Sequence, residues 1–382
     1  MKNKRPLKII LSVTVTAAVC TAVVFCHRVL FYFAAQAVLF SAKTYLPQQG
    51  VILPEFTSEV RAEDITEAES TTAAETTAAK ENVTVSTEPR GNFTDTPPDI
   101  LKIIADRKET ASKDKKDGAI REKQYKQDGV TDKFGRVRVK NVNKTGIDIE
   151  KILSEKIDLS VTKDKPSVLI FHTHTTETYQ VLDRGFYETD FRTRSESDAV
   201  NMVRVGREIC AEIEKAGYGV IHDTVIHDHS YNGAYAHSRN TVEKILEENP
   251  SIQVVLDIHR DAIQLSDGTK IKPTAKIKGK KAAQIMIISG CQEEGNPITN
   301  LPDWKYNLTF AVHLQNKLEE LYEGITRPLY FCPRSYNMNV THCSLLVEVG
   351  SDANTLEEAV YTGKCIGVAL GEILKEYEQK DE

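Results

Sequence analysis

Two histidines and a glutamate follow an apolar run in the segment VLIFHTHTTETY. His172, His174 and Glu177 come at the end of a continuous apolar stretch, which is typical of a buried strand. Two other apolar runs end in the same way, because VVLDI leads into His259 and LLV leads into Glu348. The carboxyl ends of parallel strands meet at one edge of a sheet. We therefore expect these side chains to line one crevice.

This set of side chains suits a catalytic zinc ion, which takes three protein ligands and keeps a fourth position open. His174 and Glu177 can meet in a tight turn, and His259 would complete the set of ligands. Glu348 would then act as the general base and take a proton from the attacking water. His172 is either an alternative ligand or a hydrogen-bond donor that orients one.

Each of these residues also has a purely structural interpretation. The HTH segment could be a polar turn, His259 a structural histidine, and Glu348 a buried carboxylate in an ion pair. An unpaired charge is costly to bury, so an acid inside an apolar strand calls for an explanation more than one on a surface. Taken together, the residues favour the metal site.

Other polar residues could line the same crevice. Arg260 follows His259 directly, and its planar guanidinium could bind a substrate carboxylate or stabilise an oxyanion. A second cluster with metal-like spacing has no obvious third ligand nearby and could form the rim of a pocket; it consists of His227, Asp228 and His229. The segment before Glu348 supplies three more candidates, which are Arg327, Arg334 and His342.

Strand and helix patterns alternate along the last two thirds of the chain. Strand patterns fall at residues 136–140, 167–171, 218–224, 252–259, 283–290 and 344–350, and helical patterns at 147–157, 198–217, 238–249, 309–324 and 355–379. This alternation predicts one α/β domain over residues 131–382, with a largely parallel sheet covered by helices on both faces. The basic stretch DGTKIKPTAKIKGKK is expected to be a solvated hairpin.

The first residues predict a membrane anchor. Four basic residues in MKNKRPLK precede the apolar run IILSVTVTAAVCTAVVFC, which is long enough to span a hydrocarbon core. The apolar character resumes in VLFYFAAQAVLF, so residues 1–45 favour a basic tip and an uncleaved signal-anchor over a cleaved signal peptide. The positive-inside rule then places the later residues outside the cytoplasmic membrane. Residues 46–130 are rich in Thr, Ala, Glu and then Lys, which predicts a disordered linker.

The composition excludes several other classes of protein. A net charge of −6 gives no reason to expect nucleic acid as a partner. The seven cysteines are widely scattered and form no CxxC pair, so they indicate neither a disulfide framework nor a zinc ribbon.

The motifs HTHTTETY, VVLDIHRDA and LLVEVG, in this order behind an anchor and a linker, resemble the stage II sporulation protein P family over about residues 131–382. The resemblance implies a membrane-anchored, zinc-dependent peptidoglycan hydrolase of endospore-forming bacteria. Such a protein would be an N-acetylmuramoyl-L-alanine amidase with endopeptidase activity on stem-peptide cross-links. It would act during forespore engulfment, with stage II sporulation proteins D and M as partners.

The layout is also similar to that of zinc carboxypeptidases, in which an HxxE pair, a second histidine and a later glutamate form the site. This similarity selects His174 and Glu177 as ligands. A comparison with cell-wall amidases would instead promote His172, or an acid such as Glu188 or Glu196. Both comparisons keep His259 and Glu348 in the site.

Two other functions stay open from the sequence. One is a zinc carboxypeptidase that trims stem peptides with the same ligands. The other is a catalytically inactive, membrane-tethered scaffold that binds the cell wall.

Overall fold

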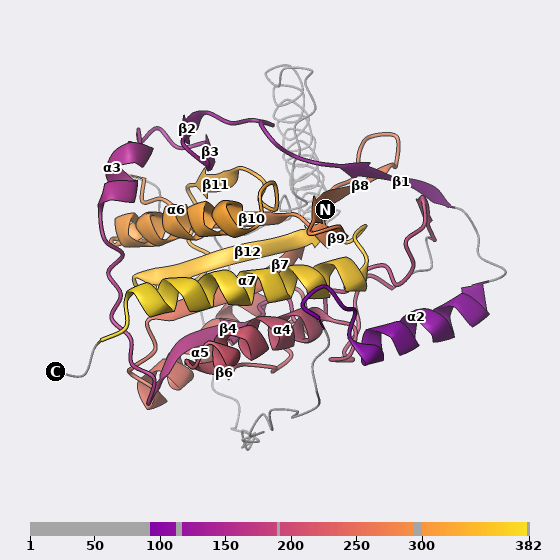
Figure 1. Ribbon diagram of the computed structural model, residues 1–382, viewed down its shortest axis with the longest axis horizontal. Helices are drawn as coiled ribbons and strands as arrows, with labels where there is room; N and C mark the ends of the chain where they lie inside the picture. Colours follow the sequence, from indigo (N-terminus) through magenta and orange to yellow (C-terminus); the bar gives the residue numbers. More distant parts are fainter. Residues whose placement is uncertain (1–91, 112–116, 189–191, 294–299, 380–382) are drawn as a thin grey trace, which may run out of the picture. The chain divides into compact units, whose positions relative to one another are not determined.

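The computed structural model describes residues 92–111, 117–188, 192–293 and 300–379. The predicted anchor and the first part of the predicted linker lie outside these ranges. Within them, no helix has the length and apolar character needed to cross a membrane. The described part of the chain forms a central sheet of eight strands, a smaller sheet of four strands, and the helices that cover them (Figure 1).

Helices and strands alternate along the described part of the chain. Its first stretch holds α2 (Pro98–Thr110), β1 (Gly118–Lys123), β2 (Asp132–Phe134), β3 (Val137–Asn141), α3 (Ile149–Ser154), β4 (Pro166–Phe171) and β5 (Phe186–Tyr187). The middle holds α4 (Met202–Lys215), β6 (Gly219–His222), α5 (Ala234–Glu248), β7 (Val254–Asp261), β8 (Lys270–Ile277) and β9 (Lys280–Ala283). The last stretch holds β10 (Ile285–Gly290), α6 (Trp304–Leu321), β11 (Leu329–Cys332), β12 (Cys343–Ser351) and α7 (Leu356–Glu376).

The central sheet has the strand order β2-β3-β11-β10-β12-β7-β4-β6. Strands β6, β4, β7 and β12 are parallel to one another, as predicted. Strand β10 is antiparallel to β12, and β11 and β3 run with β10, so the sheet is mixed rather than largely parallel throughout. The reason is a short connection. Only Gln284 separates β9 from β10. Strand β10 therefore begins beside the carboxyl end of β12 and runs in the opposite direction to β12.

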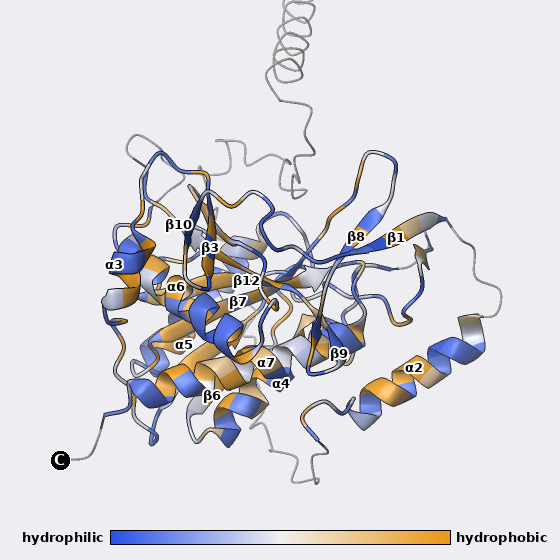
Figure 2. Cartoon of the chain, turned by 45° about the horizontal axis from the view of Figure 1, so that its top comes forward, coloured by the Kyte–Doolittle hydropathy of each residue, from blue (hydrophilic) through white to orange (hydrophobic). Residues whose placement is uncertain are grey.

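The smaller sheet has the order β5-β1-β8-β9. Its β8–β9 hairpin is the basic stretch that the sequence analysis expected to be solvated, and it turns at Lys278 and Gly279, which both have positive φ angles. Figure 2 shows β1 and β8 as largely hydrophilic ribbons. Strand β8 is nevertheless mostly buried, so the expectation of a solvated hairpin is wrong for this strand. The buried charge of its Lys272 is compensated by ion pairs with Asp183 at 2.6 Å and Glu358 at 2.8 Å.

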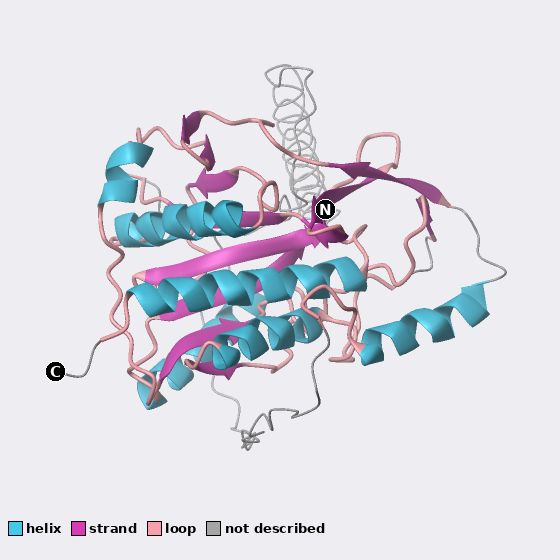
Figure 3. Cartoon of the chain, in the orientation of Figure 1, coloured by secondary structure: helices cyan, strands magenta, loops and turns pink. Residues whose placement is uncertain are grey.

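Helices cover the two faces of the central sheet unequally. Helices α4, α6 and α7 pack on one face, which we call the helix face (Figure 3). Helix α5 packs on the opposite face, where its Val242 shares a hydrophobic cluster with Phe171 of β4 and Val255 of β7. We call this second face the site face. The prediction of helices on both faces is confirmed, but much of the site face is covered by loops.

The folded part of the chain begins upstream of the predicted boundary at residue 131. Helix α2 and strand β1 both lie within the span for which we predicted a linker. Ile100 of α2 is buried in the main core, Asp99 forms an ion pair with Arg204 of α4 at 2.7 Å, and β1 pairs with β8. Most side chains of α2 are exposed, so its sequence shows only a weak apolar pattern. For this reason we predicted at most a short helix in this region.

Candidate metal and catalytic site

Alternation along β7 and β12 decides which side chains reach the site face. Ile258 and Val347 belong to the core cluster beneath the helix face. Successive side chains of a strand point to opposite faces, so Asp257, His259 and Glu348 project to the site face. His259 and Glu348 are also direct partners in the parallel register of β7 and β12. Two of the predicted residues therefore lie side by side on neighbouring strands.

His174 and Glu177 reach the same place from the turn after β4. The turn is closed by a hydrogen bond from the backbone N–H of Glu177 to the carbonyl of His174 at 3.1 Å. The ring of His174 lies 5.3 Å from that of His259, between centroids and at 90°. Glu177 Oε2 lies 3.8 Å from His259 Nδ1. All four predicted side chains, including Glu348, are less than 9% exposed, and the structure brings them together in one buried site.

Asp257 orients His259 and was missed by the sequence analysis. Its Oδ1 lies 2.8 Å from His259 Nε2, which leaves Nδ1 as the ring nitrogen that faces Glu177. Asp257 is itself held by the backbone N–H of Thr173 at 2.8 Å and by the Thr173 hydroxyl at 2.6 Å. The signal for it was present in the sequence, because an acid two residues before a histidine in a strand shares its face.

Burial and nearby charges give His174 and His259 different pKa values. Burial lowers the pKa of His174 to about 4, so its imidazole is neutral at neutral pH. Burial also works against the charged form of His259, but Asp257 and then Glu177 raise the pKa of His259 to about 9. In the site as described, one imidazole is neutral and the other is an imidazolium.

The two glutamates also differ. Burial raises the pKa of Glu348 to about 8, and the charge of Asp261 adds to that shift. Burial acts on Glu177 in the same direction, but the charges of Arg260 and His259 outweigh it and hold the pKa of that carboxyl below its ordinary value. Glu177 is thus a stable carboxylate, whereas Glu348 can exchange a proton near neutral pH.

Four polar atoms at this site are buried without a hydrogen-bond partner among the described residues. They are His174 Nδ1, Glu348 Oε2, the hydroxyl of Tyr235, and His259 Nε2, whose contact with Asp257 is an ion pair. Most buried polar groups in proteins are paired, so a concentration of unpaired ones points to a ligand or to a chemical role.

Loops form the mouth of the site. Tyr231, which is 45% exposed, stacks on His174 with ring centroids 4.8 Å apart. Arg194 lies beside it, forms an ion pair with Asp228, and has a guanidinium nitrogen 3.7 Å from Glu177 Oε1. Asp228 Oδ2 is in turn 3.8 Å from His174 Nδ1. The spacing of residues in the sequence pointed to Asp228 but gave no sign of Arg194.

His172 does not join the group. It lies on the helix face, where its Nδ1 donates to the carbonyl of Ile258 at 3.0 Å and its Nε2 is 2.9 Å from His222 Nε2. It also packs so closely against Gly206 of α4 that a Cβ there would come within 2.7 Å of the ring. With both ring nitrogens engaged, His172 has none to offer a metal ion on the site face.

Arg260 donates to backbone carbonyls, whereas we had expected it to bind a substrate group. Its Nε donates to the carbonyl of Thr178 at 2.7 Å, and its terminal nitrogens donate to the carbonyls of Asp261 and Thr193. The side chain is buried. Arg260 therefore holds the loop after β4 against β7 and does not present its guanidinium to a substrate.

The alternative acidic ligands lie apart from the histidines. Glu188 forms ion pairs with Arg107 and Arg184, both at 2.8 Å. Glu196 is 71% exposed and pairs with His229 at the surface. The second cluster also separates, since His227 pairs with Asp223 while Asp228 turns toward Arg194; its three members do not form a common site.

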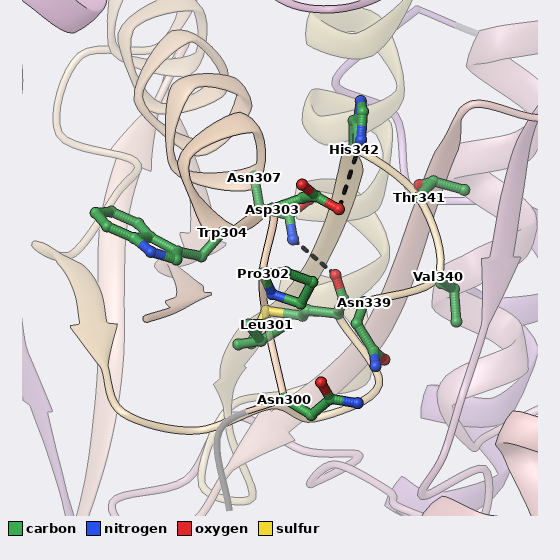
Figure 4. A pocket seen from close by; sticks show the side chains of 11 residues that line it. Asn300, Leu301, Pro302, Asp303, Trp304, Asn307, Asn339, Val340, Thr341 and His342 are labelled. Atoms are coloured by element: carbon green, nitrogen blue, oxygen red, sulfur yellow. Dashed lines mark hydrogen bonds and ion pairs between the residues drawn. The ribbon is translucent and has the colours of Figure 1, made fainter. Parts of the chain in front are cut away.

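Of the three further candidates, only Arg327 lies at the site, where it pairs with Asp261 at 2.8 Å. Arg334 is exposed on the loop after β11. His342 directly precedes β12 and lines a separate cavity of about 290 Å³, in which it faces Asp303 (Figure 4). His342 lies six positions before Glu348 along the chain, which is about 20 Å in an extended strand. This cavity is therefore at the opposite edge of the sheet.

The side chains match zinc in type more closely than in spacing. Among the residues that the structure describes, no group of three or more His, Cys, Asp and Glu side chains is close enough together to hold a metal ion. Two ligands of a tetrahedral zinc ion lie about 3.4 Å apart. His259 Nδ1 and Glu177 Oε2 are 3.8 Å apart, and His174 Nδ1 is buried without a hydrogen-bond partner among the described residues. These side chains would have to move closer together to hold the ion.

The chain is similar to several known proteins. Stage II sporulation protein P of Bacillus subtilis (strain 168) is 30% identical over 209 residues, which cover 52% of this chain and 48% of the relative. Among solved structures, the CwlD amidase of Clostridioides difficile, in complex with the GerS lipoprotein, is 14% identical with a TM-score of 0.34, and covers 55% of this chain and 99% of its own. The N-acetylmuramoyl-L-alanine amidase AmiC2 of Nostoc punctiforme is 12% identical with a TM-score of 0.33, and covers 57% and 98%. These TM-scores are too low to assign a shared fold.

The match to a family model is far more extensive. The model of stage II sporulation protein P covers residues 53–371, which include every strand and turn that carries a residue of the site. Because the match covers most of the chain, this protein belongs to the stage II sporulation protein P family.

Proposed function

We propose that this protein is a zinc-dependent peptidoglycan hydrolase. It cleaves the amide bond between N-acetylmuramic acid and the stem peptide, with endopeptidase activity on stem-peptide cross-links, during forespore engulfment in sporulation. Membership of the stage II sporulation protein P family supports the cell-wall substrate and the setting in sporulation. The chemistry is supported by the residues of the site.

One observation carries the proposal. His174, Glu177 and His259 meet in one buried site with Glu348, and three of the four have a buried polar atom without a hydrogen-bond partner among the described residues. Buried imidazoles and carboxylates that lack partners are costly to keep in a fold that does not use them. A structural polar network would have paired these atoms.

His174, Glu177 and His259 would hold the zinc ion. When bound, the ion would act as a Lewis acid toward the scissile carbonyl and would make a neighbouring water more acidic. A ligand imidazole must be neutral, so binding would displace the proton that Asp257 and Glu177 keep on His259. Asp257 would then hold the ring with Nδ1 toward the site.

Glu348 would be the general base. It lies beside His259 on the neighbouring strand, it is 2% exposed, and its Oε2 makes no hydrogen bond to a described residue. This carboxylate would accept a proton from the attacking water and donate it to the leaving amine. A group whose pKa lies near 8 is suited to both transfers at neutral pH.

The remaining predictions about cellular context are part of the same proposal. The N-terminal apolar run would anchor the chain in the cytoplasmic membrane with the catalytic domain outside, where peptidoglycan lies. Stage II sporulation proteins D and M would be its partners. Protease added to intact protoplasts should digest the catalytic domain, whereas full protection would contradict this topology.

Mass spectrometry of purified sacculi treated with the full chain tests the proposed reaction. An amidase releases intact stem peptides and leaves bare glycan, and its endopeptidase activity converts cross-linked dimers to monomers. Loss of only the terminal residue from each stem would instead identify the carboxypeptidase that the sequence analysis left open. Binding to sacculi without any released product would identify the inactive scaffold. A chelator-treated sample is the control for dependence on a metal ion.

A further inference from the structure

Tyr235 also carries a buried polar atom without a hydrogen-bond partner at the site, and the proposed function does not yet use this residue. It is the second residue of α5, the helix on the site face. Its ring lies 5.8 Å from that of His174 and 6.4 Å from that of His259, between centroids, and 5.7 Å from Tyr336. Its hydroxyl oxygen is buried and has no hydrogen-bond partner among the described residues.

Two other buried tyrosines show how this fold treats a phenol that only packs. The hydroxyl of Tyr179 donates to the carbonyl of Val349 at 2.9 Å, and that of Tyr361 donates to the carbonyl of Ile277 at 3.2 Å. A buried hydroxyl without a partner destabilises a fold. Tyr235 therefore departs from the pattern, and it does so next to both histidines.

Potential acceptors are near, yet none receives the hydrogen bond. Asp257, Glu348 and Glu177 are all close enough to act electrostatically on the phenol of Tyr235. The hydroxyl makes a hydrogen bond to none of them. The donor is thus held in a water-poor site and left available for a group that enters with the substrate.

We propose that Tyr235 is a catalytic residue whose hydroxyl donates a hydrogen bond to the oxygen of the scissile carbonyl as negative charge develops on it. This role rests on the proposed amide hydrolysis. No proton is transferred in this step; the O–H bond of Tyr235 stays intact and the hydrogen bond strengthens as the carbonyl oxygen gains charge. Arg260, the residue expected to stabilise an oxyanion, is bonded to three backbone carbonyls, so Tyr235 would fill that role.

The ring and the hydroxyl of Tyr235 have separable effects. Tyr235→Phe keeps the ring contacts with His174 and His259 and removes only the oxygen. Loss of one such donor typically lowers kcat by about 100-fold to 1,000-fold. KM should change little, because the hydrogen bond is strongest in the transition state.

The test compares Tyr235→Phe with Tyr361→Phe in the full chain, using kcat and KM on purified muropeptides, zinc content and the midpoint of thermal unfolding. Tyr235→Phe should lose at least about 100-fold in kcat with unchanged zinc content and an unfolding midpoint that is equal or higher. Tyr361→Phe removes a phenol on the helix face that is already paired, so kcat should stay normal and the midpoint should fall. Normal kcat in Tyr235→Phe would overturn the role, and so would a loss of activity that accompanies loss of zinc, which would make Tyr235 a support for the histidines.

A binding measurement keeps this inference distinguishable from the proposed function. The probe is a phosphinate analogue of the muramoyl–alanine amide, whose anionic oxygens mimic the charge of the transition state, titrated calorimetrically into both variants. Tyr235→Phe should bind it about 100-fold more weakly than the wild type and Tyr361→Phe should bind it normally. Equal affinity of wild type and Tyr235→Phe would overturn the inference. A wild type that cleaves no muropeptide would contradict the proposed function, whatever the variants do.

Discussion

Replacing Asp257 with asparagine removes one charge from the network that holds His259 and leaves the size of the side chain unchanged. Asp257 is 1% exposed, accepts two hydrogen bonds from Thr173, and lies 2.8 Å from His259 Nε2. An asparagine amide has one acceptor oxygen. Either Thr173 or His259 would therefore face the NH₂ group, and the burial of both partners keeps water from compensating.

The expected effect is on zinc affinity. Carboxylates that orient a ligand imidazole typically contribute 10-fold to 100-fold in metal affinity, which is about 1.4–2.8 kcal/mol. Because Asp257 is fully buried and both of its oxygens are engaged, we expect Asp257→Asn to fall near the upper limit, at about 100-fold. The pKa of His259 should also fall, since Asp257 is the main group that raises it.

The assay is the zinc dissociation constant of the full chain, measured by competition with a chromophoric chelator. Asp223→Asn is a matched control, because Asp223 is also buried and lies 2.8 Å from a ring nitrogen of His227, which is not a proposed ligand. It should lose stability and keep its zinc affinity. Unchanged affinity in Asp257→Asn, or an equal loss in both variants, would refute the role of Asp257 in orienting His259.

Two further predictions concern Glu348 and the buried histidine pair. Glu348→Gln preserves the shape of a general base but cannot accept a proton, so it should keep its zinc and its binding to sacculi and lose about 100-fold or more in kcat; loss of zinc would instead make Glu348 a ligand. Burial lowers the pKa of His172 from 6.5 to about 4, so the unfolded chain takes up a proton below pH 6.5 that the folded chain excludes. This exclusion should lower the unfolding free energy of the zinc-free chain by about 2 kcal/mol between pH 7 and pH 5, so the fall in the wild type should exceed the fall in His172→Gln by that amount. Denaturant titrations of wild type and His172→Gln check this, and an equal slope in both would contradict it.

The core of the site could be predicted because its residues interrupt apolar strands. An apolar run that ends in an ionisable residue identified His259 and Glu348, and the structure places them opposite each other on β7 and β12. The three-residue spacing of His174 and Glu177 predicted a tight turn, which the backbone hydrogen bond between them confirms. Local sequence is informative for these residues because each sits directly on, or next to, a buried strand.

What the sequence could not predict depends on the face of a strand or on a distant element. Strand β4 is buried on both faces and ends in a continuous apolar run, so its pattern could not predict that His172 turns to the helix face. Tyr235 belongs to a helix whose N-cap residue, Gly233, makes no side-chain capping hydrogen bond, and nothing local indicates that Tyr235 reaches the histidines. The antiparallel direction of β10 follows from its one-residue connection to β9. The apolar pattern of the sequence did not show where β9 ends and β10 begins.

The most direct test of the account is the zinc content of the purified full chain, measured by plasma mass spectrometry for the wild type and for alanine variants of His172, His174, Glu177 and His259. We expect about one zinc ion per chain in the wild type and in His172→Ala, and almost none in the other three variants, since a missing protein ligand greatly weakens such a site. A wild type that takes up no zinc would contradict the central claim. Normal zinc content in His259→Ala would contradict the proposed zinc site equally, because His259 is the proposed ligand that comes from β7 and the other two follow β4.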